Sequence, residues 1–334
     1  MDKTKNKTNR PERSNWGDWG ENDKVGQLNL ISDDVVVEAA KEIKVGKRFC
    51  LSLPLDLPGN NVLNMIRKEP RLKPIIREKA EYYNYRWDLK DKRLTDIASD
   101  DSVIIDLQFS TQWDGLCHRG AMFDQGNGPE PLYYNGFKAK DTACVTVDEA
   151  LPIGIENMAD TGVQGRAVLV DLKNEVGTDE RVEVGYDLLM SIMDKQKVKI
   201  KKGDILCLWT GLDELIIENN KSEGRNLKNK CAVLDGWDDK LLEWIASSDI
   251  SAIASDNLAI EGVGKKIPDG YKGSALPLHE QCIFKLGMHL GELWYLAEIA
   301  NWLKVNDRNT FFLTAPPLKL RGAAGSPVTP VGTV

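Results

Sequence analysis

The sequence predicts an α/β protein with a mixed β core and helices packed outside it. Apolar runs of strand length stand at residues 168–172, 205–211 and 250–254. Residues 188–195 and 239–247 lie between these runs and space their apolar side chains as amphipathic helices do. Strands that alternate with helices in this way are typical of a sheet whose faces are covered by helices.

The other elements follow in chain order. Ser32 is a good helix N-cap and predicts that a helix begins directly after it. Alternation over residues 48–55 predicts a strand, and residues 146–150 suggest the start of a short helix. The spacing of apolar residues predicts two further helices near the end of the chain, at residues 277–286 and 292–303.

Two segments differ in composition from the rest. Residues 1–15 are polar and charged, and we expect a mobile tail. Residues 63–100 interleave basic residues with prolines and aromatics, but nearby acids nearly cancel the charge, which argues against nucleic acid. We expect this segment to be a lid over a pocket or a contact with a neighbouring subunit. Residues 16–334 as a whole are expected to form a single domain.

Length and composition exclude several classes of function. The chain has 334 residues and a net charge of −7. An acidic surface argues against nucleic acid or an anionic membrane as partner, because both require a basic face. No apolar run reaches the roughly 18 residues of a transmembrane helix, and the polar N-terminus lacks the apolar core of a secretion signal. Six scattered cysteines without paired spacing fit free thiols. We therefore expect a cytoplasmic protein.

The strongest chemical signal follows the apolar run at residues 103–107, which predicts a buried strand. If the chain stays extended, alternation places Gln108, Gln112 and Asp114 on one face of it. A glycine turn then lets His118 swing back toward these groups. Amide oxygens, a carboxylate and an imidazole would thus meet at the end of one strand, which indicates a small polar site.

This run resembles the signature HxGTHxDxPxH of the cyclase family, which includes kynurenine formamidase-like proteins and isatin hydrolases. Thr111, Asp114 and His118 match it in register, whereas Gln108 and Gln112 stand where the family has its first two histidines. Segments similar to the family's opening and closing motifs extend the resemblance from about residue 16 to residue 334. The resemblance implies the cyclase-like swivelling β/β/α fold and a homodimer or homotetramer.

The resemblance also implies a divalent-metal site that polarises a carbonyl and generates hydroxide. His118 falls on the family's general acid/base. Glu280 is an alternative carboxylate for one ligand position. Amide oxygens are weak ligands for zinc, so an oxygen-rich set favours Mn²⁺, Mg²⁺ or Ca²⁺ over Zn²⁺, although Mn²⁺ and Zn²⁺ are the family's usual metals. The positions carried over as metal ligands are Gln108, Gln112, Asp114, His279 and Glu292.

Three functions remain open at this point. The first is metal-assisted hydrolysis of a C–N or C–O bond in an amide, lactam or lactone of a small cyclic or aromatic molecule. The second is a metal-independent cyclase or dehydratase, in which Asp114 orients His118 as a general base and the glutamines donate hydrogen bonds to a carbonyl. The third is a binding protein without turnover. The candidates to line a substrate pocket are Trp19, Trp113, Tyr133 and Tyr134.

Overall fold

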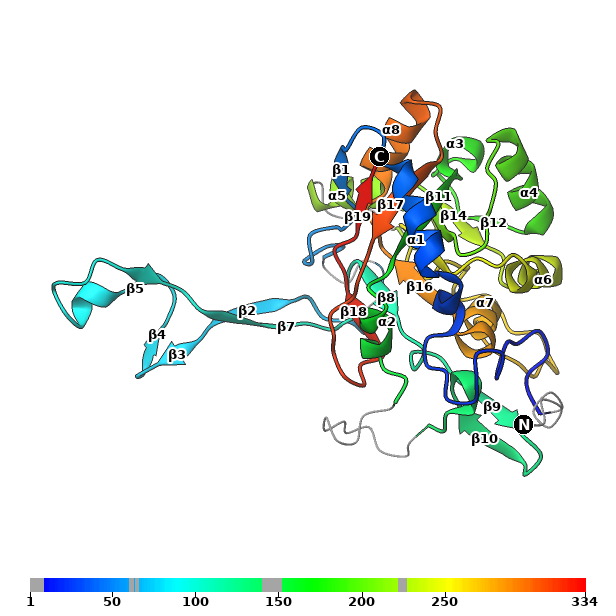
Figure 1. Ribbon diagram of the computed structural model, residues 1–334, viewed down its shortest axis with the longest axis horizontal. Coiled ribbons are helices and arrows are strands. Elements are labelled where there is room, and N and C mark those ends of the chain that lie inside the picture. Colours follow the sequence, from blue (N-terminus) through cyan, green and yellow to red (C-terminus); the bar gives the residue numbers. More distant parts are fainter. Residues whose placement is uncertain (1–8, 60–62, 64–65, 140–151, 222–226) are drawn as a thin grey trace.

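The computed structural model describes residues 9–59, 63, 66–139, 152–221 and 227–334. A nine-stranded mixed sheet forms the centre of the molecule (Figure 1). Four neighbouring strands, β11, β13, β15 and β16, run parallel, and the outer pairs are antiparallel. In sheet order the strands are β1 (Arg48–Cys50), β19 (Val331–Thr333), β17 (Thr310–Thr314), β11 (Gln164–Asp171), β13 (Ile205–Trp209), β15 (Ala252–Ser255), β16 (His289–Glu292), β8 (Gln112–Asp114) and β18 (Gly325–Pro327).

Both faces of this sheet are buried under helices. Side chains alternate along β13, so Cys207 and Trp209 join a core shared with α8, while Leu206 and Leu208 join a second core shared with α4 and α6. The prediction of an α/β fold with a mixed β core is therefore confirmed. The helices are α1 (Asp33–Ala39), α2 (Glu156–Asp160), α3 (Lys173–Val176), α4 (Tyr186–Lys195), α5 (Leu212–Lys221), α6 (Asp239–Ser247), α7 (Pro277–His279) and α8 (Ala297–Val305).

The helices that were predicted best have strong local start signals. The Asp238 carboxylate accepts hydrogen bonds from the backbone N–H groups of Lys240 and Leu241 and so caps α6, whose bounds match the prediction. The Ser32 hydroxyl likewise accepts from the Val35 N–H at the start of α1. Within the described residues no helix has the length and apolar character needed to cross a membrane.

The prediction of a buried strand at residues 103–107 is wrong. β7 (Asp101–Ile104) instead pairs with β2 (Arg71–Pro74) in a ribbon that leaves the body of the molecule (Figure 1). Val103 and Ile104 are 51% and 59% exposed, so their apolar character does not reflect burial within this chain. Residues 66–106, called the arm below, also contain β3 (Ile76–Arg77), β4 (Ala80–Glu81), β5 (Tyr85–Arg86) and β6 (Ile97–Ala98).

Of the two helices predicted near the C-terminus, one is shorter than expected. Residues 292–296 are not helical, because Glu292 ends β16 and α8 begins at Ala297. Residues 277–286 are helical throughout, as predicted, because the turn α7 continues directly into the π-helical turn Glu280–Lys285. Two further two-stranded sheets pair β9 (Ala121–Asp124) with β10 (Pro129–Leu132) and β12 (Val182–Val184) with β14 (Ala232–Leu234).

The N-terminal segment is packed before Trp16. The Asn15 N–H donates to the carbonyl of Lys285, and Arg10 forms an ion pair with Asp18 at 2.7 Å. Asn15 is buried. The ordered contacts therefore begin inside the segment that was expected to be a tail. Residues 1–8 of that tail and the short helix expected at residues 146–150 lie outside the described residues.

Candidate active site

Strand β8 carries two of the predicted site residues and lies between β16 and β18 in the sheet. Gln112 is directly opposite Glu292 on β16, so their side chains lie on the same face. The Gln112 Nε2 donates to the Glu292 Oε2 at 2.7 Å. Asp114 is two residues further along β8 and shares that face. The antiparallel register thus brings an amide and two carboxylates together from segments about 180 positions apart.

His279 at the end of α7 adds an imidazole to these groups. Its Nε2 lies 3.4 Å from the Glu292 Oε1 and 4.0 Å from the Asp114 Oδ2. Its Nδ1 lies 2.7 Å from the Glu261 Oε1, and the Glu261 carboxylate also accepts the backbone N–H groups of Leu278 and His279. A carboxylate at Nδ1 favours the tautomer that leaves Nε2 free, which is the arrangement of metal-binding histidines.

These groups fit a metal ion. One ligand atom each from Asp114, His279 and Glu292 lie within 4.8 Å of one another, and all three residues are buried. Both carboxylate oxygens of Asp114 and the Gln112 Oε1 are buried without a hydrogen-bond partner. Leaving such acceptors unpaired is costly, and a cation held between them would remove the cost. Two carboxylates, one amide oxygen and one imidazole form a set rich in oxygen donors.

The electrostatics of the cluster reflect this crowding. Burial, reinforced by the nearby Glu292 charge, raises the pKa of Asp114 well above its ordinary value. Burial alone would lower the pKa of His279, but its hydrogen bonds to Glu261 and Glu292 outweigh this and raise the pKa to about 9. Two acids and a base are therefore held close together at a buried position.

His118 lies at the more accessible edge of the cluster. Its Nε2 is 3.5 Å from the Asp114 Oδ2, and its side chain is 19% exposed, whereas that of Asp114 is fully buried. Burial, with smaller effects from the positive charges of His279, Arg67 and Arg119, lowers the pKa of His118 to about 3. The imidazole is therefore neutral at pH 7 and has a lone pair available to accept a proton.

The two remaining candidate metal positions are Gln108 and Glu280. The Gln108 backbone carbonyl accepts a hydrogen bond from Arg67, and its side-chain amide packs over Gly325, the residue that pairs with Asp114 on β18. Its role as a ligand stays a prediction. Glu280 pairs with Lys285 at 3.5 Å and is not part of the cluster, so the alternative carboxylate is wrong.

Sequence reasoning missed Glu261, Arg67 and Arg119. Glu261 lies in a stretch that the sequence shows only as a glycine-rich loop, and no local pattern connects it with His279, 18 positions downstream. Arg67 comes from the base of the arm, although its charge acts on both Asp114 and His118. Arg119 directly follows the last residue of the motif, and this position is the one feature of the sequence that could have identified Arg119 as a site residue.

The four aromatic residues expected to line a pocket are not gathered at one place. Trp113 points to the opposite face of β8, packs edge-on against Trp294 and is fully buried in the core. Tyr134 is also fully buried, and its hydroxyl donates to Asp23. The lining role is therefore wrong for these two. Tyr133 is partly buried beside the same small core as Tyr134, and Trp19 lines a separate hollow of about 320 Å³.

Comparison with known proteins agrees with this architecture. The Cyclase family model, described as "Putative cyclase", matches residues 51–262. A solved structure described as a novel cyclase is 29% identical, covers 96% of this chain and 99% of its own, and superposes with a TM-score of 0.75. A search of curated proteins finds no match.

Two isatin hydrolases share the fold at lower identity. Isatin hydrolase A from Ralstonia solanacearum is 12% identical with a TM-score of 0.54, and covers 86% of this chain and 91% of its own. Isatin hydrolase A from Labrenzia aggregata is 14% identical with a TM-score of 0.55, and covers 91% and 98%. The family resemblance read from the motif at Thr111, Asp114 and His118 is therefore confirmed over most of the chain. The protein belongs to the cyclase family.

Proposed function

We propose that this protein is a metal-dependent hydrolase that cleaves the C–N or C–O bond of an amide, lactam or lactone in a small cyclic or aromatic molecule. The observation that carries the proposal is the buried group of Asp114, His279 and Glu292, in which both Asp114 oxygens have no partner. The substrate class follows the isatin hydrolases that share the fold, one of which is bound to benzyl benzoate, an aromatic ester.

Four residues are the proposed metal ligands: Asp114 and Glu292 through their carboxylates, His279 through Nε2 and Gln112 through Oε1. When bound there, a divalent cation polarises the substrate carbonyl and lowers the pKa of water. Three oxygen donors and one nitrogen favour Mn²⁺, with Mg²⁺ next, over Zn²⁺, which prefers imidazole and thiolate.

Side chains of the protein then have the remaining roles in the reaction. His118, beside Asp114 at the accessible edge of the cluster, takes the proton from the attacking water and returns it to the leaving nitrogen or oxygen. Glu261 fixes the tautomer of His279, and Gln112 holds Glu292 in place. Trp19 and Tyr133 stay predictions as contacts to the substrate.

Metal content tests the proposal first. Protein dialysed against Mn²⁺ and then against metal-free buffer should retain one ion per chain by elemental analysis, and Asp114→Asn and Glu292→Gln should each lose it. Asp187→Asn removes an exposed carboxylate on α4 and serves as the matched control that keeps the metal. Retention of one ion per chain by both site variants would rule out these residues as ligands.

Turnover tests the reaction. A panel of aromatic amides, lactams and lactones should show hydrolysis that a chelator abolishes and added Mn²⁺ restores. His118→Ala should lower kcat by roughly 10²–10⁴-fold, the usual contribution of a general base, while keeping the metal. Full turnover in the presence of chelator would contradict the proposal and favour the metal-independent cyclase or dehydratase, for which the close approach of His118 to Asp114 is the supporting geometry.

A further inference from the structure

Two arginines beside the candidate active site have no acidic partner. In the described part of the chain seven arginine side chains are partly or fully buried. Five of them have a carboxylate oxygen within 3.8 Å: Arg10, Arg13, Arg166, Arg181 and Arg308. The two exceptions are Arg67 and Arg119. A guanidinium stays charged at every physiological pH, and burial of a charge without a counter-charge is costly. These two side chains therefore favour an anion that the chain itself does not supply.

Both guanidiniums lie near the proposed general base. Arg119 directly follows His118 in the chain, and Arg67 donates a hydrogen bond to the backbone carbonyl of Gln108. Burial lowers the pKa of His118 most, and the two arginine charges add to this effect. The same charges oppose the rise in pKa that burial causes at Asp114. Both arginines are therefore within electrostatic range of the proposed base and of a proposed metal ligand.

The charge of the site leaves one positive charge unbalanced. Asp114, Glu292 and Glu261 are three buried carboxylates around His279. The divalent ion of the proposed function balances two of these charges, and one arginine balances the third. The other arginine then has no counter-charge, so a ligand with a single negative charge would complete the balance. A phosphate monoester, with a charge of about −2 at pH 7, would exceed it.

We propose that the substrate carries a carboxylate, and that Arg119 and Arg67 bind this carboxylate while the scissile bond lies beside His118. The inference rests on the proposed function, because it assigns the charge of the molecule that the same site hydrolyses. A planar guanidinium binds a carboxylate through two parallel hydrogen bonds, which an ammonium group cannot form. The two arginines thus select an acid over a neutral molecule of the same shape.

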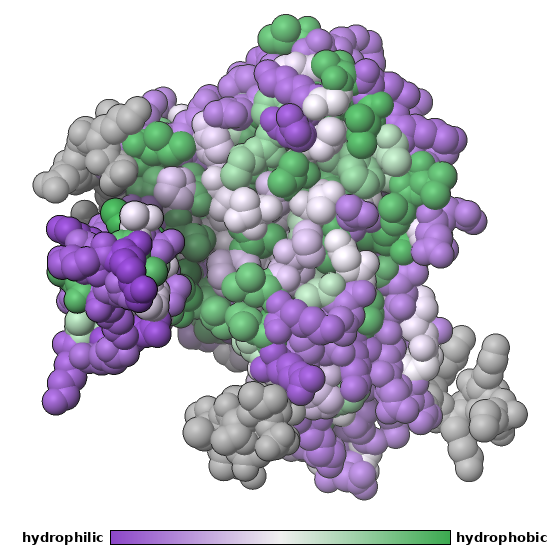
Figure 2. All heavy atoms as spheres, turned by 60° about the vertical axis from the view of Figure 1, so that its left-hand side comes forward, coloured by the Kyte–Doolittle hydropathy of each residue, from purple (hydrophilic) through white to green (hydrophobic). Residues whose placement is uncertain are grey.

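The rest of the substrate meets apolar surroundings. Figure 2 shows that the body surface turned to the same side as the arm, at whose base Arg67 lies, is largely hydrophobic or intermediate in hydropathy. A hollow of about 430 Å³ has Glu261, the partner of His279, in its wall, and its apolar lining residues include Leu258 and Val263. An aromatic or branched aliphatic acid fits such a lining better than a small polar acid does.

Binding of a simple probe tests the inference without requiring turnover. Benzoate and benzamide have the same ring and nearly the same shape, but only benzoate carries a charge. Isothermal titration calorimetry on Mn²⁺-loaded wild type should show that benzoate binds about 10–100-fold more tightly than benzamide, the range of a charge-assisted hydrogen bond. Equal affinity for the two probes would overturn the proposal.

Variants separate the arginines from the metal as the source of this preference. Arg119→Gln and Arg67→Gln should each weaken benzoate binding by about 10–100-fold and leave benzamide binding unchanged. Arg119→Lys keeps the charge but not the two parallel hydrogen bonds, so its loss should be smaller. Arg48→Gln is the matched control, because Arg48 is exposed on β1, at the other edge of the sheet from β8 and β18. Unchanged benzoate affinity in both glutamine variants would show that the metal alone holds the carboxylate.

Kinetics distinguish substrate binding from stabilisation of the transition state. In the panel of amides, lactams and lactones, each acid is compared with its carboxamide. Arg119→Gln should raise KM for the acid by about 10–100-fold and leave kcat, and both constants of the carboxamide, within a few-fold of the wild type. An equal fall in kcat for the acid and the carboxamide would contradict the proposal, because Arg119 would then act on the reacting carbonyl.

Two controls keep this inference separate from the proposed hydrolysis. Arg119→Gln should retain one Mn²⁺ per chain and the Tm of the wild type, since it removes an unpaired charge; Arg67→Gln tests the same carboxylate site if the first variant folds poorly. Metal-dependent hydrolysis of neutral compounds only, with no preference for benzoate, would refute the carboxylate site and leave the hydrolase intact. Benzoate preference that depends on Arg119 in a protein without metal or turnover would support the carboxylate site and refute the hydrolase.

Discussion

Thr111 is a buried hydroxyl that connects the motif segment to the end of β16. Its Oγ1 accepts the Leu53 N–H at 2.9 Å and donates to the carbonyl of Leu293. Leu293 follows Glu292 directly and has φ +56°, a left-handed conformation that a leucine rarely adopts. The Thr111 hydroxyl therefore helps to hold the strained residue next to a proposed metal ligand.

We expect Thr111→Val to lower the free energy of unfolding by about 2–3 kcal/mol, because it leaves a buried N–H and a buried carbonyl unpaired. Thr111→Ser keeps the hydroxyl and loses only a methyl group, so its cost should be near 1 kcal/mol. Urea unfolding of both variants measures the difference. Equal losses for valine and serine would show that packing, and not the hydroxyl, matters at this position.

His289, which begins β16, supplies a pH dependence. It is 1% exposed, its Nδ1 has no hydrogen-bond partner, and burial lowers its pKa to about 3. Below pH 6.5 the unfolded chain binds a proton at this residue that the folded chain does not. Stability should therefore fall as the pH drops from 6.5 toward 3, by about 2 kcal/mol at pH 5 from this residue.

The measurement is the slope of unfolding free energy against pH between 5 and 6.5 for the wild type and for His289→Gln. The variant cannot titrate, so its slope should be smaller by the contribution of about one proton. Comparing the slopes separates the titration of His289 from any change in unfolding free energy that the substitution causes at pH 7. Identical slopes would mean that His289 is protonated, or partnered, in the folded protein.

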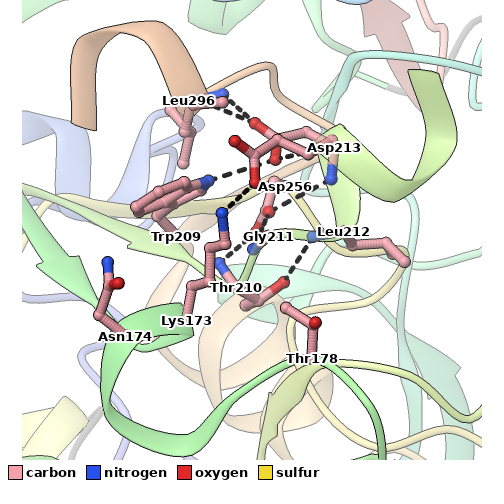
Figure 3. Close-up of polar contacts among 12 residues, drawn as sticks. Lys173, Asn174, Thr178, Trp209, Thr210, Gly211, Leu212, Asp213, Asp256 and Leu296 are labelled. Carbon is pink, nitrogen blue, oxygen red and sulfur yellow. Dashed lines mark hydrogen bonds and ion pairs between the residues drawn. The ribbon is translucent and has the colours of Figure 1, made fainter. Parts of the chain in front are cut away.

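At the scale of elements, a pair of buried acids joins two helices to the sheet (Figure 3). Asp213 accepts the N–H groups of Leu296 and Ala297, both at 2.7 Å, and thereby caps α8. Asp256, at the end of β15, accepts the N–H groups of Thr210 and Gly211 just before α5. Burial raises the pKa of both carboxyls, and the charge of Asp256 raises the pKa of Asp213 further.

Asp213→Ala should destabilise the fold by at least about 2 kcal/mol, since it removes a helix cap and leaves two buried N–H groups without an acceptor. Asp187→Ala is the matched control. Its side chain is 80% exposed in the first turn of α4, and its loss should cost less than about 1 kcal/mol. Thermal and urea unfolding measure both. A loss no larger than that of the control would mean that water caps α8 equally well.

At the scale of the whole molecule, the proposed metal site predicts that metal binding is coupled to folding. Asp114 and Glu292 face each other in the apo protein, and their mutual repulsion opposes folding. Mn²⁺ at 100 times its Kd should stabilise the wild type by about 2.7 kcal/mol and raise Tm.

Asp114→Asn should abolish this increase in Tm and leave the apo protein at least as stable as the wild type, because one buried charge is gone. Differential scanning calorimetry with and without Mn²⁺ measures both effects, and Asp187→Asn should respond as the wild type does. An increase in Tm that persists in Asp114→Asn would place the metal elsewhere.

Local sequence patterns were sufficient to predict many of the secondary-structure elements and several residues of the candidate site. The strands β11, β13 and β15 and the helices α4 and α6 follow from apolar periodicity and caps, because their burial repeats with the period of the element itself. The motif likewise led to Asp114, Gln112 and His118, and the downstream residues His279 and Glu292 do meet Asp114 in the structure.

Tertiary structure decided the rest. The run at residues 103–107 has the composition of a buried strand, yet it lies in the exposed arm, because composition records that a surface is apolar and not which chain covers it. Trp113 belongs to the core, because its side chain packs against Trp294, a residue far away in the sequence.

By itself the sequence determined the class of fold and the family motif, both of which depend on residues close together in the chain, and the resemblance that the motif carries pointed to the distant His279 and Glu292. Only the three-dimensional structure revealed the contact of Glu261 with His279, the pairing of Gln112 with Glu292 and the exposure of the arm. The physical reason is that each of these depends on strand register and packing between distant segments, for which one sequence carries no local signal.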